Sequence, residues 1–389
     1  MNPLKYLLEK EKHDLNDEIP EEFKDEVGKI CSEYLTGEWE KVDKNSISIQ
    51  RISGGNSNHV FKVSISNKNE NPVLLRIYGT ECEEEIFKDT LLFSILSEKK
   101  LGPKFLGYFP GGRLEEFIES RSLVTRELAY PSVLKILARK LAGIHSLEVP
   151  LSKRPQIFDM IRSELKKIED ATTPNYLIKI KTTKLCNLKY PEGVTIQELE
   201  KEVRLLEDYV KRYNIKIVFS HNDIFEGNII VRNNATIEKD KIISDDENDC
   251  IIVIDYEYSC YNYRGFDFSQ IFREMAYSYD SSFEHGYQIY QEHLKNDEKL
   301  LVFINEYLKE MFKINNIVID EEKLKKETSQ LLFESKIFFQ VVDLYWGIWN
   351  IRQGFISTIK SYNFMLHGLD RLALFYDNKQ HELLNGDSF

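Results

Sequence analysis

The sequence predicts an α+β protein with two lobes: a small β-rich N-terminal lobe over residues 1–118 and a larger, mostly helical C-terminal lobe over residues 119–389. Short runs of apolar residues with strand-like spacing dominate residues 45–118. After residue 119, apolar residues recur mostly at helical spacing. The length of 389 residues also favours two domains, and a chain of this length buries a large core without disulfides.

The N-terminal lobe is expected to hold a β-β-β-α-β-β sheet preceded by a helical extension. Helical periodicity covers residues 21–39, and Gly102-Pro103 ends a second helix over 82–100. Turns at Gly54-Gly55 and at residues 110–112 separate strand patterns. The expected strands are 47–52, 60–65, 73–78, 105–109 and 113–118.

The C-terminal lobe is expected to be helical, with three short apolar strands. The expected helices are 131–147, 157–170, 195–213, 264–280, 282–296, 298–312, 321–349 and 350–376. The expected strands are 215–219, 228–231 and 250–254. A cleft between two such lobes is a usual place for a ligand.

The composition excludes several classes of protein. With 52 basic and 64 acidic residues, the net charge of −12 disfavours general binding of nucleic acid or anionic membranes. The five cysteines are scattered and form no CxxC pair, which argues against a disulfide framework or a zinc site. No apolar run reaches the ~18–20 residues that span a bilayer, and residues 1–22 lack the apolar core of a signal peptide. We therefore expect a cytoplasmic protein with no stable membrane insertion.

The strongest chemical signal is a polar loop that follows the strand ending at Phe219. The loop carries Asp223 and Asn228, and Asp255 follows the strand 250–254. This is the spacing of kinase-type phosphoryl-transfer sites, where one Asp accepts the hydroxyl proton while the Asn and the later Asp hold magnesium. Magnesium prefers hard oxygen ligands. Either Asp alone more often caps a turn or ends a strand, but together they predict an ATP- and magnesium-dependent site.

A glycine turn and a lone arginine in the N-terminal lobe indicate phosphate binding. Two glycines let backbone N–H groups approach a phosphate, although a glycine pair alone is more often a simple hairpin. Arg76 is a charge inside the apolar run 73–78, so it needs an anionic partner if that strand is covered. An exposed edge strand is the alternative. The turn consists of Ser53, Gly54, Gly55, Asn56 and Ser57.

Two of the three tryptophans, Trp346 and Trp349, share one face of a predicted helix. Tryptophan is the best cation–π partner, and aromatic cages recognise quaternary ammonium groups. The alternative is a stripe of core residues, which is the more frequent reason for two aromatic residues at this spacing.

These segments together resemble the choline/ethanolamine kinase family, which has a protein-kinase-like two-lobe fold. The similarity runs from about residue 50 to about residue 375. It is carried by ISGGNSNHVFKV (52–63), VLLRIYG (73–79), LGPKFLGYFPGGRLEEFIESRSL (101–123), LAGIHSLEVP (141–150), FSHNDIFEGNIIV (219–231), VIDYEYSCYNYRGFDFSQIFREMAY (253–277) and YWGIWNIRQ (345–353).

The resemblance implies a choline kinase that uses ATP and Mg²⁺ to make phosphocholine, the first step of the CDP-choline route to phosphatidylcholine. Asp223 would be the general base. Asp255 would be the main magnesium ligand, assisted by Asn228 and supported by Glu257. The glycine turn would cover the phosphates and Arg76 would pair with them.

The resemblance also implies an adenine site and an amine site. Adenine would be held through backbone groups of an inter-lobe hinge, and the amine by aromatic side chains and a carboxylate. A homodimer is possible because the family often dimerises. The implied hinge is Glu115, Glu116, Phe117 and Ile118, and the implied amine site is Tyr258, Glu274, Tyr279, Trp346 and Trp349, next to Asp223.

The choice between choline and ethanolamine rests on small differences. EGN at 226–228 and RGFD at 264–267 favour choline, with ethanolamine as a weaker substrate. An ethanolamine or dual-specificity kinase is the alternative within enzymes, and a catalytically dead pseudokinase is the alternative of another class. Phe225 departs from the glutamine that choline kinases commonly carry. Further aromatic positions of the family fall near Tyr362 and Phe364, with the register off by about one residue.

Overall fold

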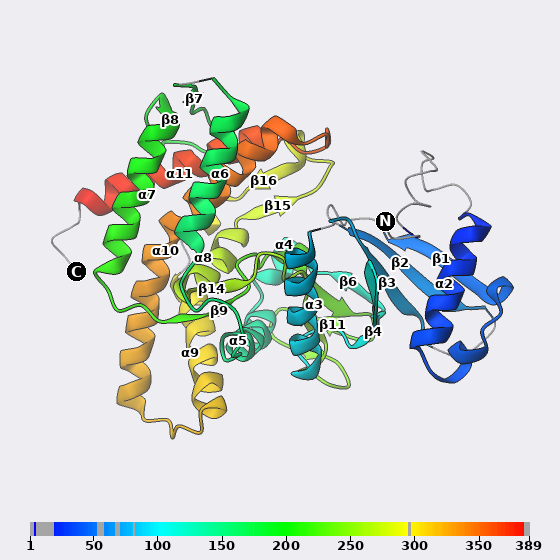
Figure 1. Cartoon of the computed structure of the whole chain (residues 1–389). Coiled ribbons are helices and arrows are strands. Elements are labelled where there is room, and N and C mark those ends of the chain that lie inside the picture. Colours follow the sequence, from blue (N-terminus) through cyan, green and yellow to red (C-terminus); the bar gives the residue numbers. More distant parts are fainter. Residues whose placement is uncertain are drawn as a thin grey trace. The chain divides into compact units, whose positions relative to one another are not determined.

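The structure is a computed structural model, and it describes residues 4, 19–52, 58–66, 71–80, 82–173, 175–294 and 297–384. The chain divides into two compact units, Met1–Ser120 and Arg121–Phe389. The first unit contains an antiparallel sheet and the second is mostly helical (Figure 1), which confirms the predicted α+β class.

The sheet of the first unit has the strand order β1-β2-β3-β5-β4 and carries a helix on each face. Alternation along β3 separates the faces: Leu75 joins Phe23 of α2 in one core, whereas Arg76 and Tyr78 lie on the other face. The Tyr78 hydroxyl is 2.8 Å from that of Thr90 in α3. The bounds are α2 Glu21–Tyr34, β1 Ile47–Ile52, β2 Asn58–Ile65, β3 Val73–Tyr78, α3 Glu83–Glu98, β4 Phe105–Phe109 and β5 Gly112–Glu116, with 3-10 turns at Gly37–Lys41 and Lys44–Ser46.

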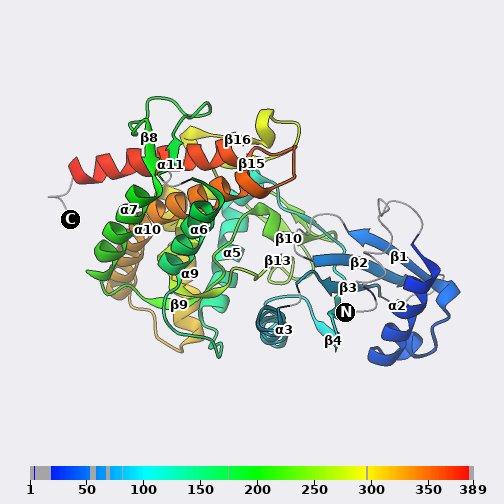
Figure 2. The same ribbon diagram turned by 45° about the horizontal axis from the view of Figure 1, so that its top comes forward.

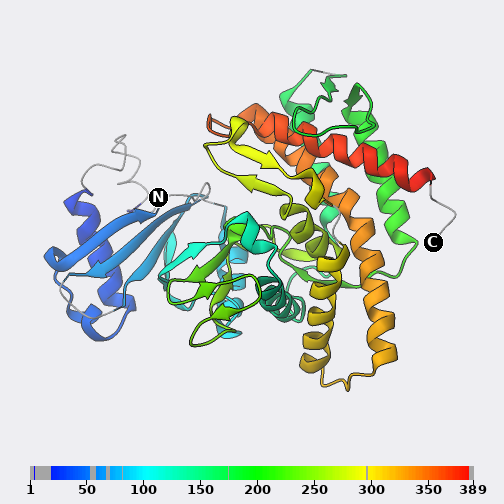
Figure 3. The same cartoon turned by 180° about the vertical axis from the view of Figure 1, so that it is seen from behind.

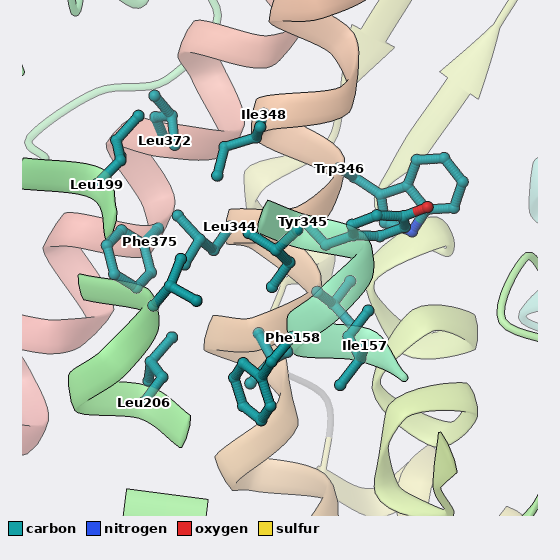
Figure 4. Packing of buried hydrophobic residues seen from close by; sticks show 14 of the residues in the cluster. Ile157, Phe158, Leu199, Leu206, Leu344, Tyr345, Trp346, Ile348, Leu372 and Phe375 are labelled. Atoms are coloured by element: carbon teal, nitrogen blue, oxygen red, sulfur yellow. The ribbon is translucent and has the colours of Figure 1, made fainter. Parts of the chain in front are cut away.

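The core of the second unit surrounds α10, the longest helix that the structure describes. Figure 4 shows Phe158 of α6, Leu206 of α7, Leu344 of α10 and Phe375 of α11 in one cluster. Asp320 caps the start of α10 by accepting the Glu322 N–H at 2.9 Å. The helices are α4 Thr125–Leu128, α5 Pro131–His145, α6 Ile157–Ala171, α7 Ile196–Lys211, α8 Gly265–Glu274, α9 Asp297–Ile314, α10 Glu321–Ile356 and α11 Phe364–Leu384.

Two glycines let α10 and α11 approach closely where they cross (Figure 2). A Cβ atom on Gly368 of α11 would lie 2.7 Å from the carbonyl oxygen of Gly347 and 2.7 Å from the Cγ1 atom of Ile351. Real Cβ atoms do not come this near to backbone, so the two helices meet at a distance that a side chain at Gly368 would not allow.

Short antiparallel strands of the second unit bring distant loops together. β9 pairs with β14, and β10 lies between β13 and β6. Ile229 therefore pairs with Val253, which brings the ends of two polar loops side by side. The strands are β6 Ser120–Ser122, β7 Leu177–Lys179, β8 Gly193–Thr195, β9 Ile217–Ser220, β10 Ile229–Arg232, β11 Thr236–Ile237, β12 Ile242–Ile243, β13 Ile251–Val253, β14 Cys260–Tyr263, β15 Tyr277–Tyr279 and β16 Tyr287–Ile289; 3-10 turns cover Glu226–Asn228, Glu284–Gly286 and Gln291–His293.

Three helix predictions were wrong in their extent or type. Residues 282–296 contain β16 and two 3-10 turns, because His285 and Gly286 have φ of 70° and 78° and turn the chain back as a hairpin (Figure 3). The helix expected over 264–280 ends at Glu274, and the chain then forms strand β15. The helix break expected at 349/350 comes after Ile356, since no Gly or Pro interrupts α10 at Trp349.

Candidate active site

Asp267 at the start of α8 holds the loop that follows β9. Its two carboxylate oxygens accept the backbone N–H groups of His221 (2.9 Å) and Asn222 (2.7 Å). His145 of α5 lies behind it, with Nε2 3.0 Å from Asp267 Oδ2. Asn222 has a φ of 67°, so these contacts stabilise a left-handed residue next to Asp223.

Asp223 and Asn228 face each other across this loop, as their spacing indicates. The Asn228 side chain donates from Nδ2 to Asp223 Oδ2 (2.9 Å) and to the Asp223 carbonyl oxygen (3.0 Å). Burial raises the pKa of Asp223 well above its ordinary value, and the charges of Asp255, Glu274 and Glu257 raise it further. Four carboxylates from three separate stretches of the chain are therefore neighbours.

The backbone joins the Asp255 turn to the Asp223 loop. The Ile254 N–H donates to the Asn228 carbonyl oxygen (3.0 Å), and His221 Nε2 lies 3.0 Å from the Ile254 carbonyl oxygen. Asp255 itself has a φ of 66° and an exposed side chain, and Glu257 is also exposed. The structure thus brings together the residues that the sequence singled out for catalysis and metal binding.

The tyrosines and tryptophans predicted for amine binding belong to a larger set of aromatic rings, which we call the aromatic chain. Each ring contacts the next, with centroids between 4.6 and 6.1 Å apart. Tyr362 and Phe364, whose register was open in the sequence, are part of it. The aromatic chain consists of Tyr258, Trp346, Trp349, Phe364, Tyr362, Tyr279 and Phe225, in this order of contact.

The two tryptophans differ in their surroundings. Trp346 is only 7% exposed, belongs to the core and donates from Nε1 to Gln270. Trp349 is partly buried and donates from Nε1 to the Tyr258 hydroxyl oxygen (3.1 Å). The alternative of a core stripe therefore describes Trp346, whereas Trp349 lies at the edge of the core.

Glu274 contacts the aromatic chain at Tyr279 and pairs with a buried arginine. Tyr279 donates its hydroxyl to Glu274 Oε2 (2.7 Å), and Arg371 of α11 donates to Oε1. Arg371 is fully buried, lies over the Tyr277 ring (4.0 Å to the centroid) and donates from Nε to His367 (3.1 Å). Sequence reasoning missed Arg371, although a charge inside the apolar run LDRLALFY is the signal that identified Arg76.

Glu226 is a second buried carboxyl group near Asp223. Its Oε1 accepts the Thr125 hydroxyl (2.9 Å), and its side chain is buried. Burial, followed by the charge of Glu274, raises the pKa of Glu226 to about 8. The sequence singled out Glu226 only as the first residue of the EGN motif at 226–228.

In the first unit, Arg76 has the anionic partner that its position required. β3 lies inside the sheet, so the alternative of an edge strand is wrong. Arg76 Nε donates to Glu115 Oε1 (2.6 Å), and Arg113 Nε donates to the same oxygen (2.7 Å). Burial alone would raise the pKa of Glu115, but the two arginines lower it. Asp89 of α3 completes the group by accepting from Arg113.

Of the other residues predicted to bind the nucleotide, the structure describes those at 115–118. Residues 53–57, the glycine turn, lie outside the described residues. Beyond Glu115, Glu116 accepts the Lys104 N–H at 3.1 Å, Lys62 Nζ lies 4.4 Å from the centroid of the Phe117 ring, and Ile118 is buried.

Comparisons with known proteins all indicate one family, and the similarity covers most of the chain. A family model described as choline/ethanolamine kinase matches residues 49–376. A human choline/ethanolamine kinase is 33% identical over 359 residues, which cover 90% of this chain and 84% of the relative. Choline kinase A2 of Caenorhabditis elegans is 31% identical over 93% of this chain and 87% of the relative. A choline kinase structure from Cryptosporidium parvum matches 93% of this chain and 97% of its own, with a TM-score of 0.71 at 22% identity, a likeness of fold.

Across the ranges that the structure describes, no helix combines the length and the apolar character needed to cross a bilayer.

Proposed function

The chain belongs to the choline/ethanolamine kinase family, and we propose that it is a choline kinase. It transfers the γ-phosphoryl group of ATP to the hydroxyl of choline and releases phosphocholine and ADP, which feeds the CDP-choline route to phosphatidylcholine. The observation that carries this proposal is the Asp223–Asn228 hydrogen bond, next to the turn that delivers Asp255 and in the same unit as the aromatic chain.

Asp223 acts as the general base. Its raised pKa makes its carboxylate a stronger base than an ordinary Asp. Asn228 orients the group by donating to Oδ2, and the other oxygen accepts the hydroxyl proton. The choline oxygen then bonds to the γ-phosphorus while the bond from that phosphorus to ADP breaks.

Magnesium would be held by Asp255 and Asn228, with Glu257 supporting it directly or through water. The exposed carboxylates of Asp255 and Glu257 suit magnesium, which usually keeps several waters and binds one or two carboxylates together with substrate phosphates. When bound, the ion neutralises charge on the transferred phosphoryl group.

Nucleotide and amine contacts follow the same proposal. Arg76, held in place by Glu115, pairs with the ATP phosphates, and residues 115–118 hold adenine through the backbone. The phosphate contacts of residues 53–57 stay a prediction from the sequence. The amine is recognised by Tyr258, Tyr279, Trp346 and Trp349 as aromatic walls and by Glu274 as a carboxylate. The cytoplasmic location and the homodimer stay predictions from the sequence.

The experiment that tests the function is ADP release from ATP and Mg²⁺ with choline and ethanolamine tested separately, and with Asp223→Asn as the blank. We expect turnover with choline that is lost in the variant. A higher kcat/KM for ethanolamine would make the protein an ethanolamine kinase. No turnover with either amine, in a folded protein that binds ATP, would identify a pseudokinase and contradict the proposal.

A further inference from the structure

Beside the proposed amine site, one buried carboxyl oxygen has no hydrogen-bond donor among the described residues. Both oxygens of Glu274 already accept hydrogen bonds, Oε1 from Arg371 and Oε2 from Tyr279. Oε1 of Glu226 accepts from Thr125, but Oε2 of Glu226 is buried and has no hydrogen-bond partner among the described residues. A buried acceptor without a donor is costly, so the site has a place for a donor that the protein does not supply.

Glu226 lies next to the end of the aromatic chain that Tyr279 and Phe225 form. The ring of its neighbour Phe225 contacts the Tyr279 ring edge-on, with centroids 6.0 Å apart. Burial contributes most to the raised pKa of the Tyr279 and Tyr362 hydroxyls, and the charges of Glu274 and Glu226 add to it. Glu226 therefore acts on the same group of side chains that the proposed function assigns to the amine.

From this geometry we propose that Glu226 Oε2 accepts an N–H of substrates whose ammonium group carries N–H donors, and so sets how well the enzyme uses ethanolamine relative to choline. This inference rests on the proposed function. A trimethylammonium group has no N–H to donate and gains only from the rings and the overall charge, whereas a primary ammonium needs acceptors to replace water. An ionised carboxylate has acceptor sites on both oxygens, so Oε2 accepts the N–H while Oε1 keeps the Thr125 hydroxyl.

The test is a series of amino alcohols that differ only in the number of N–H donors on the ammonium: ethanolamine, N-methylethanolamine, N,N-dimethylethanolamine and choline. The variant Glu226→Met removes both oxygens at similar length. We expect it to lower kcat/KM for ethanolamine about tenfold or more relative to choline, as for loss of a hydrogen bond to a charged group. The loss should decrease in order along the series.

Glu226→Gln is the second variant and decides the matter if the Met variant does not fold. It keeps one oxygen but no charge, so we expect a smaller loss in the same order, about threefold for ethanolamine relative to choline. Glu127→Gln is the matched control, because Glu127 is equally buried but both its oxygens accept from Arg121. It should leave the ratio between the substrates unchanged.

Equal losses for all four amines in the Glu226 variants would overturn the inference and indicate a purely structural role in the loop. If the unmodified enzyme turns over choline alone, the other three amines are tested as competitive inhibitors, and failure of all three to bind also overturns it. If the unmodified enzyme turns over no amine, the proposed function itself fails, which is a different result.

Discussion

Each unit holds a group of two arginines and two carboxylates, and the two groups differ in how far their arginines are covered. In the first unit, Arg76 and Arg113 share Glu115, and the Arg76 side chain remains 26% exposed. In the second unit, Arg371 pairs with Glu274 and Arg273 with Asp343 (2.8 Å), and neither arginine side chain is more than 5% exposed. Asp255 and Glu257, which belong to the same unit, are exposed.

The difference shows how similar ion pairs serve different ligands. A sheet face that leaves one guanidinium partly open suits an anion such as a phosphate. In the second unit the two arginines of this group are covered, and Asp255 and Glu257 are exposed, which suits cations, both a metal ion and an ammonium group. The charge that stays accessible, and not the number of ion pairs, matches the ligand assigned to each unit.

The largest expected effect comes from removing the central anion of the second unit. Asp223→Asn should lower kcat by about 10²–10⁴-fold, because the general base is lost. ATP binding, measured by calorimetry, should change little, since the proposed phosphate contacts are elsewhere. Near-normal turnover in this variant would show that Asp223 is not the base.

Removing a covered arginine should affect folding most. Arg371→Met leaves Glu274 and the nearby Asp343 without their shared cation and should lower the free energy of unfolding by about 3–5 kcal/mol. Urea unfolding monitored by circular dichroism measures this. Arg371→Lys is the control and should lose less. A loss below about 1 kcal/mol in the Met variant would mean that the pair contributes little.

Removing the partly open arginine should affect the nucleotide instead. In Arg76→Met, Glu115 keeps Arg113, so we expect little change in stability. The KM for ATP should rise about tenfold, as for loss of one charged hydrogen bond. The measurement is steady-state kinetics with ATP varied at saturating choline. A large loss of stability with an unchanged KM for ATP would make Arg76 a structural residue only.

The smallest effect concerns the edge of the aromatic chain. Trp349→Ala should raise the KM for choline about two- to fivefold, the range of a cation–π contact that is not fully desolvated. The KM for ethanolamine should rise less. Kinetics with both amines compare the two, and equal increases would argue against a ring that favours the methylated cation.

Local patterns could be predicted from the sequence, whereas partners across the fold could not. Asp223 and Asn228 are five positions apart in a short loop bounded by strands, so the two residues lie close together. That Arg76 needs an anion also followed from the sequence, but Glu115 became its partner only through the pairing of β3 with β5. The aromatic chain joins rings from residue 225 to residue 364, and helical periodicity links only Trp346 with Trp349 among them.

The close crossing of α10 and α11 makes the amine site vulnerable to mutations that touch no ligand. Gly347 lies between the two tryptophans in the chain, and Gly368 lies three residues before Arg371. A single added methyl group at Gly368 would force the helices apart and move the rings away from the buried carboxylate. Substitutions at Gly368 are therefore expected to lower substrate affinity, while the residues that carry out phosphoryl transfer stay unchanged.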